Sequence, residues 1–127
     1  MKLNEKIKKH ILSNTLSRSE RKIGIEVECF IYKNNFNRIP VNKSEEYSAI
    51  DLLNELNKIN NDANGTYSLE PGGQIEWSSP PCANMFELDD ALASYKNLMD
   101  NILSKRNLIS LHIGVEPFTD PDSIELI

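Results

Sequence analysis

Several features are scarce in this sequence of 127 residues, and each absence excludes a class of protein. Two cysteines, Cys29 and Cys82, are too few for the disulfide framework of a small secreted scaffold. No apolar run is long enough to cross a bilayer. The N-terminus also lacks the apolar core and the small-residue cleavage site of a signal peptide. We therefore expect a cytoplasmic protein that does not bind membranes.

Basic residues are also fewer than acidic residues in this chain. The chain has 14 lysines and arginines against 19 aspartates and glutamates, which gives a net charge of −5. A field of this sign repels nucleic acid and anionic lipid surfaces, so we expect neither as a partner. The hydrophobic fraction of 39% is ordinary for a globular protein, and the length suits one domain better than two. We expect a single domain over residues 1–127.

Hydrophobic periodicity predicts a chain that alternates between helices and strands in the order α-β-β-α-β-β-α-β. This order favours an α+β fold with a largely antiparallel sheet and amphipathic helices packed on one of its faces. The predicted helices lie at residues 3–16, 44–59 and 84–106, and the predicted strands at 22–32, 38–41, 66–70, 73–79 and 107–117.

Proline and glycine mark two special positions among these strands. Pro40 has no N–H to donate, so the strand at 38–41 fits only at a sheet edge. Pro71 followed by Gly72 suits the two central positions of a type II turn, which would join the strands on either side into a hairpin.

Acceptor side chains recur on two of the predicted strands. Side chains alternate between the faces of a strand, so Glu26 and Glu28 in GIEVECF share one face. Gln74 and Glu76 in GQIEWS likewise share one face. The apolar residues between them must meet the helices. The acidic faces therefore point toward solvent or a cleft.

Two interpretations of these acidic faces remain open. An antiparallel sheet with one solvated face would show the same alternation. However, if the two acidic strands are neighbours, like charges oppose each other and destabilise the pair. A divalent cation would offset that repulsion, and Mg²⁺ is held by one or two carboxylates together with water and phosphate oxygens. The pattern thus indicates either a metal site or a solvated acidic surface.

Two segments resemble a known family. IGIEVECFI at residues 23–31 and SLEPGGQIEWSSPP at 68–81 resemble motifs of the glutamate–cysteine ligases of the plant and proteobacterial type, the GCS2 family. The first motif is short, but the second is long and specific. The predicted helix at 84–106 and the following GVEP also sit where the family has a helix and a strand end.

The resemblance implies a fold and a reaction. The implied fold is part of the one shared by glutamine synthetase and the guanidino kinases. The implied reaction uses ATP to phosphorylate the γ-carboxylate of glutamate, and the amine of cysteine then attacks the acyl phosphate, as in glutathione biosynthesis. ATP, glutamate and cysteine are thus the implied small-molecule partners, and Mg²⁺ is the implied cofactor.

The resemblance also implies roles for individual residues. Glu26, Glu28 and Glu76 match acids of the two motifs and are expected to be Mg²⁺ ligands, with Glu70 as a further ligand. Gln74 is expected to contact substrate or to hold one of the metal-binding acids in place. No residue of the chain is assigned as a catalytic acid, base or nucleophile, since phosphoryl transfer depends mainly on positioning and charge neutralisation.

Family members are considerably longer, and their nucleotide-binding basic residues lie in sequence that this chain does not include. The chain thus resembles the N-terminal portion of such a ligase, and we expect residues 1–127 to be inactive alone. A missing C-terminal portion or an oligomer would complete the site. The alternative is a non-catalytic module that binds a divalent cation and pairs with a partner chain.

Four other residues with chemically useful side chains are expected to have structural roles. Cys29 and Trp77 fall on the apolar faces of their strands and are expected in the core. His112 lies within the last predicted strand and is expected to be a structural histidine. Cys82 follows two prolines in a loop, where it could be exposed, but no neighbouring base would activate it as a nucleophile.

Overall fold

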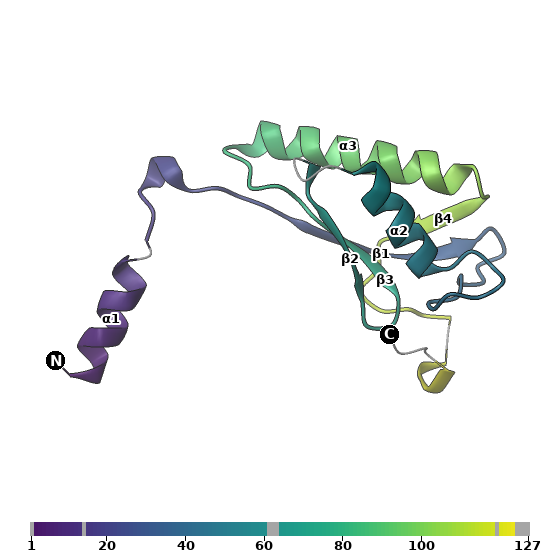
Figure 1. Ribbon diagram of the computed structural model, residues 1–127, viewed down its shortest axis with the longest axis horizontal. Coiled ribbons are helices and arrows are strands. Elements are labelled where there is room, and N and C mark those ends of the chain that lie inside the picture. The colour runs from purple at the N-terminus through teal and green to yellow at the C-terminus, as the bar shows by residue number, and fades with distance from the viewer. Residues whose placement is uncertain (1, 14, 61–63, 119, 124–127) are drawn as a thin grey trace.

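The structure is a computed structural model, and it describes residues 2–13, 15–60, 64–118 and 120–123. Four antiparallel strands form one sheet, two helices cover one face of that sheet, and a third helix lies apart from it (Figure 1). The α+β class and the antiparallel sheet with helices on one face are therefore confirmed.

The sheet has the strand order β2-β3-β1-β4. The central strand β1 pairs through its first half with β3 and through its second half with β4, so these neighbours lie on opposite sides of it. β2 and β3 form the predicted hairpin. The strands are β1 at Glu26–Lys33, β2 at Thr66–Glu70, β3 at Gln74–Ser78 and β4 at Leu108–Leu111.

Helices α2 (Ala49–Ile59) and α3 (Met85–Ser104) are both capped at their first turn. The Ser48 hydroxyl accepts from the Asp51 backbone N–H, and the Asp51 carboxylate accepts from the Ser48 backbone N–H. This capping box satisfies two of the N–H groups that a helix start leaves without intrahelical partners. At α3, the Asn84 side chain accepts from two backbone N–H groups. Side-chain caps thus fix where both helices begin.

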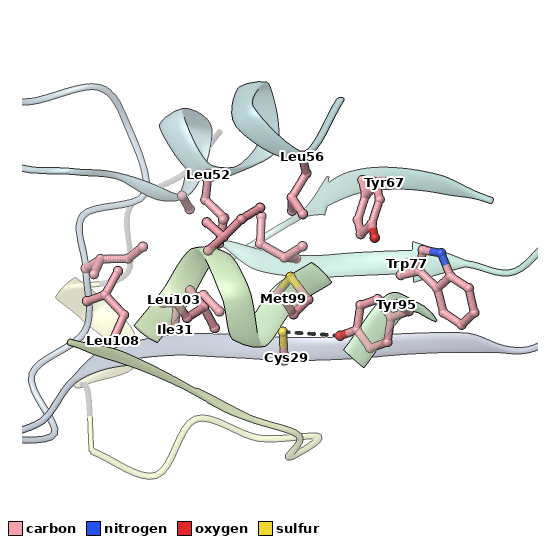
Figure 2. Packing of buried hydrophobic residues seen from close by; sticks show 14 residues of the cluster. Cys29, Ile31, Leu52, Leu56, Tyr67, Trp77, Tyr95, Met99, Leu103 and Leu108 are labelled. Carbon is pink, nitrogen blue, oxygen red and sulfur yellow. Dashed lines mark hydrogen bonds between the residues drawn. The ribbon is translucent and has the colours of Figure 1, made fainter. Parts of the chain in front are cut away.

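The hydrophobic core lies between the sheet and these two helices (Figure 2). Trp77 of β3 is fully buried and stacks on Tyr95 of α3, with ring centroids 4.7 Å apart and an interplanar angle of 13°. Cys29 of β1 is fully buried beside the same tyrosine, and burial raises the pKa of its thiol to about 11. Both residues are core residues, as their positions on the strands predicted.

The N-terminal helix α1 (Leu3–Ser13) does not cover the sheet, although the sequence predicted that three helices would. It lies away from the other elements, and none of its residues is buried (Figure 1). The buried side chains on the apolar face of the sheet pack against α2 and α3. Among the described residues, no helix is both long enough and apolar enough to span a membrane.

Other differences lie at the ends of elements. The predicted strand at 38–41 is reduced to a single bridge between Tyr32 and Arg38, because Pro40 cannot continue a ladder. The second helix begins after Ser48, which caps it, and not at residue 44. The last strand ends at Leu111, well before residue 117. Short 3-10 turns occur at Arg18–Glu20 and Pro121–Ser123.

Cys82 is buried, at 4% exposure, so the exposed position that the sequence left open for its thiol is not the one it takes. The backbone of Cys82 forms two hydrogen bonds with that of Ile23, so the loop after β3 packs against the segment before β1. The pairing of Cys82 with Ile23 keeps the Cys82 side chain buried, even though the residue follows two prolines in a loop.

Candidate functional site

The predicted acceptor residues do share one face of the sheet. The residues between them belong to the core or pack against it: Val27 and Cys29 on β1, and Ile75 and Trp77 on β3. Since side chains alternate along a strand, the acceptors lie on the face opposite α2 and α3. We call this surface the acidic face. Its members are Glu26, Glu28, Glu70, Gln74 and Glu76.

Glu28 and Glu76 are the two acids that the structure brings together most directly. They are register partners across β1 and β3, and Ser68 of β2 pairs with Glu76 on its other side. Directly opposed residues of an antiparallel pair have Cβ atoms about 4.5–5.5 Å apart. Glu26 lies on the same face, two residues before Glu28 on β1, and its register partner is Ser78. The sequence prediction that acids of two neighbouring strands oppose each other holds for the pair Glu28 and Glu76.

Neutral donors hold both of these carboxylates. The hydroxyls of Ser68 and Ser78 lie 3.2 Å and 3.3 Å from Oε1 of Glu76 and donate to it. The side-chain amide of Gln74 donates to Oε2 of Glu28 over 3.0 Å. An ionised carboxylate has about four acceptor sites, so these bonds orient the groups without exhausting them. These hydrogen bonds orient both carboxylates.

Glu70 and Gln74 flank the turn between β2 and β3 and are themselves register partners. The turn closes with a hydrogen bond from the Gly73 N–H to the Glu70 carbonyl over 2.9 Å. Gly72, at its third position, has φ +83, the positive value that a type II turn requires there. The predicted turn is confirmed. It places Glu70 and Gln74 opposite each other on the acidic face.

Arg38 is a neighbour of this turn that sequence reasoning missed. Its guanidinium stacks over the Phe30 ring, 4.7 Å from the centroid, and donates to the carbonyl of Gly72. A cation over an aromatic face is attracted by the ring quadrupole. Arg38 therefore ties the turn to the segment after β1. No spacing in the sequence links these positions, because the contact arises only once the hairpin lies beside β1.

The acidic face does not extend along the whole of β1. Phe30 and Tyr32 share the face of Glu28, yet both are buried. The Tyr32 hydroxyl donates to the Glu116 carboxylate, and the Phe118 ring meets Tyr32 edge-on at 5.9 Å. Burial, followed by the contact with Glu116, raises the pKa of Tyr32. The segment after β4 covers this half of the face, on the side away from the helices (Figure 1).

The pairing of β1 with β3 ends at Glu26, which pairs with Ser78. Beyond this end, Ile23 and Cys82 form an isolated bridge whose register is shifted by one residue. A shallow hollow opens here, lined by Gly24, Ile25, Glu26, Ser78 and Ser79.

The donor set fits a hard cation only in part. Within the described ranges, no three histidine, cysteine, aspartate or glutamate side chains are close enough together to form a metal site. The closest arrangement in register is the pair Glu28 and Glu76, which supplies hard oxygen donors. Mg²⁺ commonly takes one or two carboxylates and completes its shell with water and phosphate oxygens. The pair fits that ion, and the metal roles of Glu26, Glu28, Glu70 and Glu76 and the substrate role of Gln74 stay predictions.

Comparison with protein families identifies the family of the chain. The model of glutamate-cysteine ligase family 2 (GCS2) matches residues 22–125, a range that contains the whole sheet and the acidic face. No curated protein and no solved structure gives a significant match, so a detailed likeness to the glutamine synthetase fold stays a prediction. Family membership indicates a ligase of the glutamate–cysteine ligase type. Since the match covers most of the sequence and includes both acidic motifs, this chain belongs to glutamate-cysteine ligase family 2.

Proposed function

We propose that this chain supplies the Mg²⁺-binding carboxylates of an ATP-dependent ligase that joins the γ-carboxylate of glutamate to the amine of cysteine, in cytoplasmic glutathione biosynthesis. Family membership supports the ligase class. The observation that carries the metal assignment is the placement of Glu28 directly opposite Glu76 on the acidic face. Two like charges in that position destabilise a sheet unless something offsets them.

The proposed reaction has two steps. An oxygen of the glutamate γ-carboxylate takes the γ-phosphoryl group of ATP, and ADP leaves. The amine nitrogen of cysteine then attacks the acyl carbon, the bond to the phosphate oxygen breaks, and phosphate leaves with the proton that the amine loses as the amide forms. The first step brings phosphate charge toward a carboxylate, so positioning and charge neutralisation determine its rate.

Each residue of the acidic face has a role in this proposal. Mg²⁺, when bound, neutralises phosphate charge and orients the phosphoryl group. Glu28 and Glu76 would hold the ion. Glu26 and Glu70 could join them as ligands only if their side chains moved, because no three acids of the described residues lie close enough together to form a site. Gln74 orients the Glu28 carboxylate through its amide, and the same side chain contacts substrate.

We further propose that residues 1–127 form a single domain corresponding to the N-terminal portion of the ligase. The nucleotide-binding basic residues would then come from a C-terminal portion or from another chain. The net charge of −5 supports this division, since it leaves little cationic surface for ATP phosphates.

The test is a titration of the full chain with Mg²⁺ and Mn²⁺ by calorimetry. Glu28→Gln and Glu76→Gln keep the side-chain shape and remove one charge, and each should weaken cation binding by roughly tenfold or more. Glu45→Gln is the matched control, because Glu45 is exposed in the loop before α2 and lies off the sheet. Unchanged affinity in both sheet variants would refute the metal assignment.

The ligase and the non-catalytic module differ in whether the cation site takes part in catalysis. If the chain is the N-terminal portion of the ligase, a protein that also carries the C-terminal portion should join glutamate to cysteine with ATP. Glu28→Gln should abolish that activity, and Glu45→Gln should retain it. Cation binding without activity in the longer protein would favour the non-catalytic module.

A further inference from the structure

A cavity away from the acidic face opens between the end of α2, the start of β2 and the middle of α3. Its volume is about 190 Å³. A water molecule takes about 30 Å³ in the liquid, so this space exceeds that of a single buried water and suits a small molecule. Tyr67 and Tyr95 of the core form part of its wall, so it lies on the helix-covered side of the sheet. We call it the α2–α3 cavity.

One polar atom in the lining of this cavity lacks a partner. Asn60 follows the last residue of α2, and its Nδ2 donates to the Gly65 carbonyl over 2.7 Å. Only the amide nitrogen can donate, so this bond also fixes which atom is the oxygen. That oxygen, Oδ1, is buried and accepts no hydrogen bond from a described residue. An unpaired buried acceptor costs free energy, so a ligand that donates to it is favoured.

Much of the remaining wall is apolar and aromatic. Tyr67 of β2 lies beside Tyr95 of α3, with ring centroids 6.3 Å apart (Figure 2). Ile59 and Leu98 add aliphatic side chains to the same lining. Aromatic faces attract cations through the ring quadrupole, and the attraction is larger where water is excluded. Walls of this kind suit a short apolar stem that carries a cationic group.

The charges around the cavity favour a positive ligand. The C-terminal end of a helix carries a partial negative charge, and α2 ends beside Asn60. A second hollow shares part of the lining and also contains Glu87 and Asp90. Lys58, in the last turn of α2, is exposed and belongs to neither lining, and among the described residues both linings lack basic side chains. An anion would therefore be repelled here, whereas an ammonium group would find an acceptor.

We propose that the α2–α3 cavity is a binding site for a small organic cation, an ammonium group on a short apolar stem. The ammonium group donates to Oδ1 of Asn60. Its stem packs against the rings of Tyr67 and Tyr95. This inference is independent of the proposed function, because the cavity and the acidic face lie on opposite sides of the sheet.

The test is nuclear magnetic resonance of the isotope-labelled full chain, in about 0.15 M salt to screen weak surface attraction. Three probes of similar size are titrated: n-butylammonium, butanol and butyrate. We expect only n-butylammonium to shift two signals saturably, the Asn60 side-chain amide and the Trp77 indole N–H. The indole is a local probe because it donates to the carbonyl of Asn64, a residue of the lining, over 2.9 Å.

Three results of this titration would overturn the proposal. The first is the absence of a saturable shift at Asn60 and Trp77. The second is an equal shift caused by butanol or butyrate, which would show that the cavity does not select a cation. The third is a shift confined to Glu28 and Glu76, which would place the cation on the acidic face.

Two exposed serines of α3 provide a matched pair of variants. Ser94 lines the cavity, whereas Ser104 ends the helix and belongs to neither lining. Ser94→Lys adds a positive charge at the cavity and should raise the dissociation constant of n-butylammonium by about fivefold or more. Ser104→Lys adds the same charge far along the helix and should change it by less than about twofold. Equal constants in both variants would contradict the proposed site.

A third variant tests the acceptor itself. Asn60→Leu keeps a side chain of similar size and removes Oδ1, so saturable binding of n-butylammonium should be lost. Retained binding in the folded variant would overturn the proposal. Because Asn60→Leu also loses the bond to Gly65, Ser94→Lys decides the question if this variant does not fold.

Discussion

Gly73, in the turn that joins β2 to β3, allows a quantitative test of how the structure shapes the acidic face. Its φ is +82, where a side chain costs about 1–2 kcal/mol. An added Cβ would lie 2.6 Å from Cγ2 of Val41 and 2.9 Å from Nη2 of Arg38. Val41 is 4% exposed, so it cannot move aside freely, and overpacking costs about 1–3 kcal/mol. Gly73→Ala should therefore lower the free energy of unfolding by roughly 2–5 kcal/mol.

Urea unfolding followed by fluorescence of Trp77 measures this loss, because that tryptophan is fully buried in the core. Gly114→Ala is the matched control. No atom lies within 4 Å of a Cβ built at Gly114, so its free energy of unfolding should change by less than about 0.5 kcal/mol. If the two variants are equally stable, the close approach of the turn to Val41 and Arg38 does not exist.

Further predictions concern the core, the cap of α2 and the thiols. Leu56→Ala should cost about 2–5 kcal/mol in urea unfolding, because Leu56 is fully buried, and a cost below 1 kcal/mol would contradict that packing. Ser48→Ala should cost about 1 kcal/mol by the same measurement through loss of the cap. Hydrogen bonds from Ser48 hold the pKa of Asp51 below its ordinary value of 3.8. Its stabilisation is therefore present at neutral pH and lost as pH falls through the folded-state pKa, and Asp51→Asn should flatten the acid side of the stability profile. Cys29 and Cys82 are buried, and the pKa of Cys29 is about 11, so at pH 8 a thiol reagent should label neither before urea is added.

The faces of the strands could be predicted from sequence because the side-chain period of a strand is fixed. Glu26 and Glu28 alternate with Val27 and Cys29, so only one orientation of β1 places apolar side chains against the helices. The structure shows that orientation. The turn at Gly72 was equally predictable, since proline followed by glycine restricts the backbone locally.

Contacts between distant segments could not be predicted in this way. The contact of Arg38 with Gly72 joins residues 34 positions apart, and the covering of Tyr32 by Glu116 joins residues 84 apart. The segments around Arg38 and Glu116 have no hydrophobic periodicity that would indicate which residues they contact. The amphipathic pattern of α1 was identified correctly, but periodicity shows that a face needs covering and not which surface covers it.

The central claim, that Glu28 and Glu76 form a cation site, is tested most directly by thermal unfolding with and without Mg²⁺. Without the ion, Glu28→Gln and Glu76→Gln should be more stable than the wild-type chain by up to about 1 kcal/mol, because like charges no longer oppose each other. With Mg²⁺, the melting temperature of the wild-type chain should rise, because the ion binds the folded state, while both variants should gain little. Variants that are less stable without the ion, or that gain as much from it as the wild-type chain does, would contradict the account.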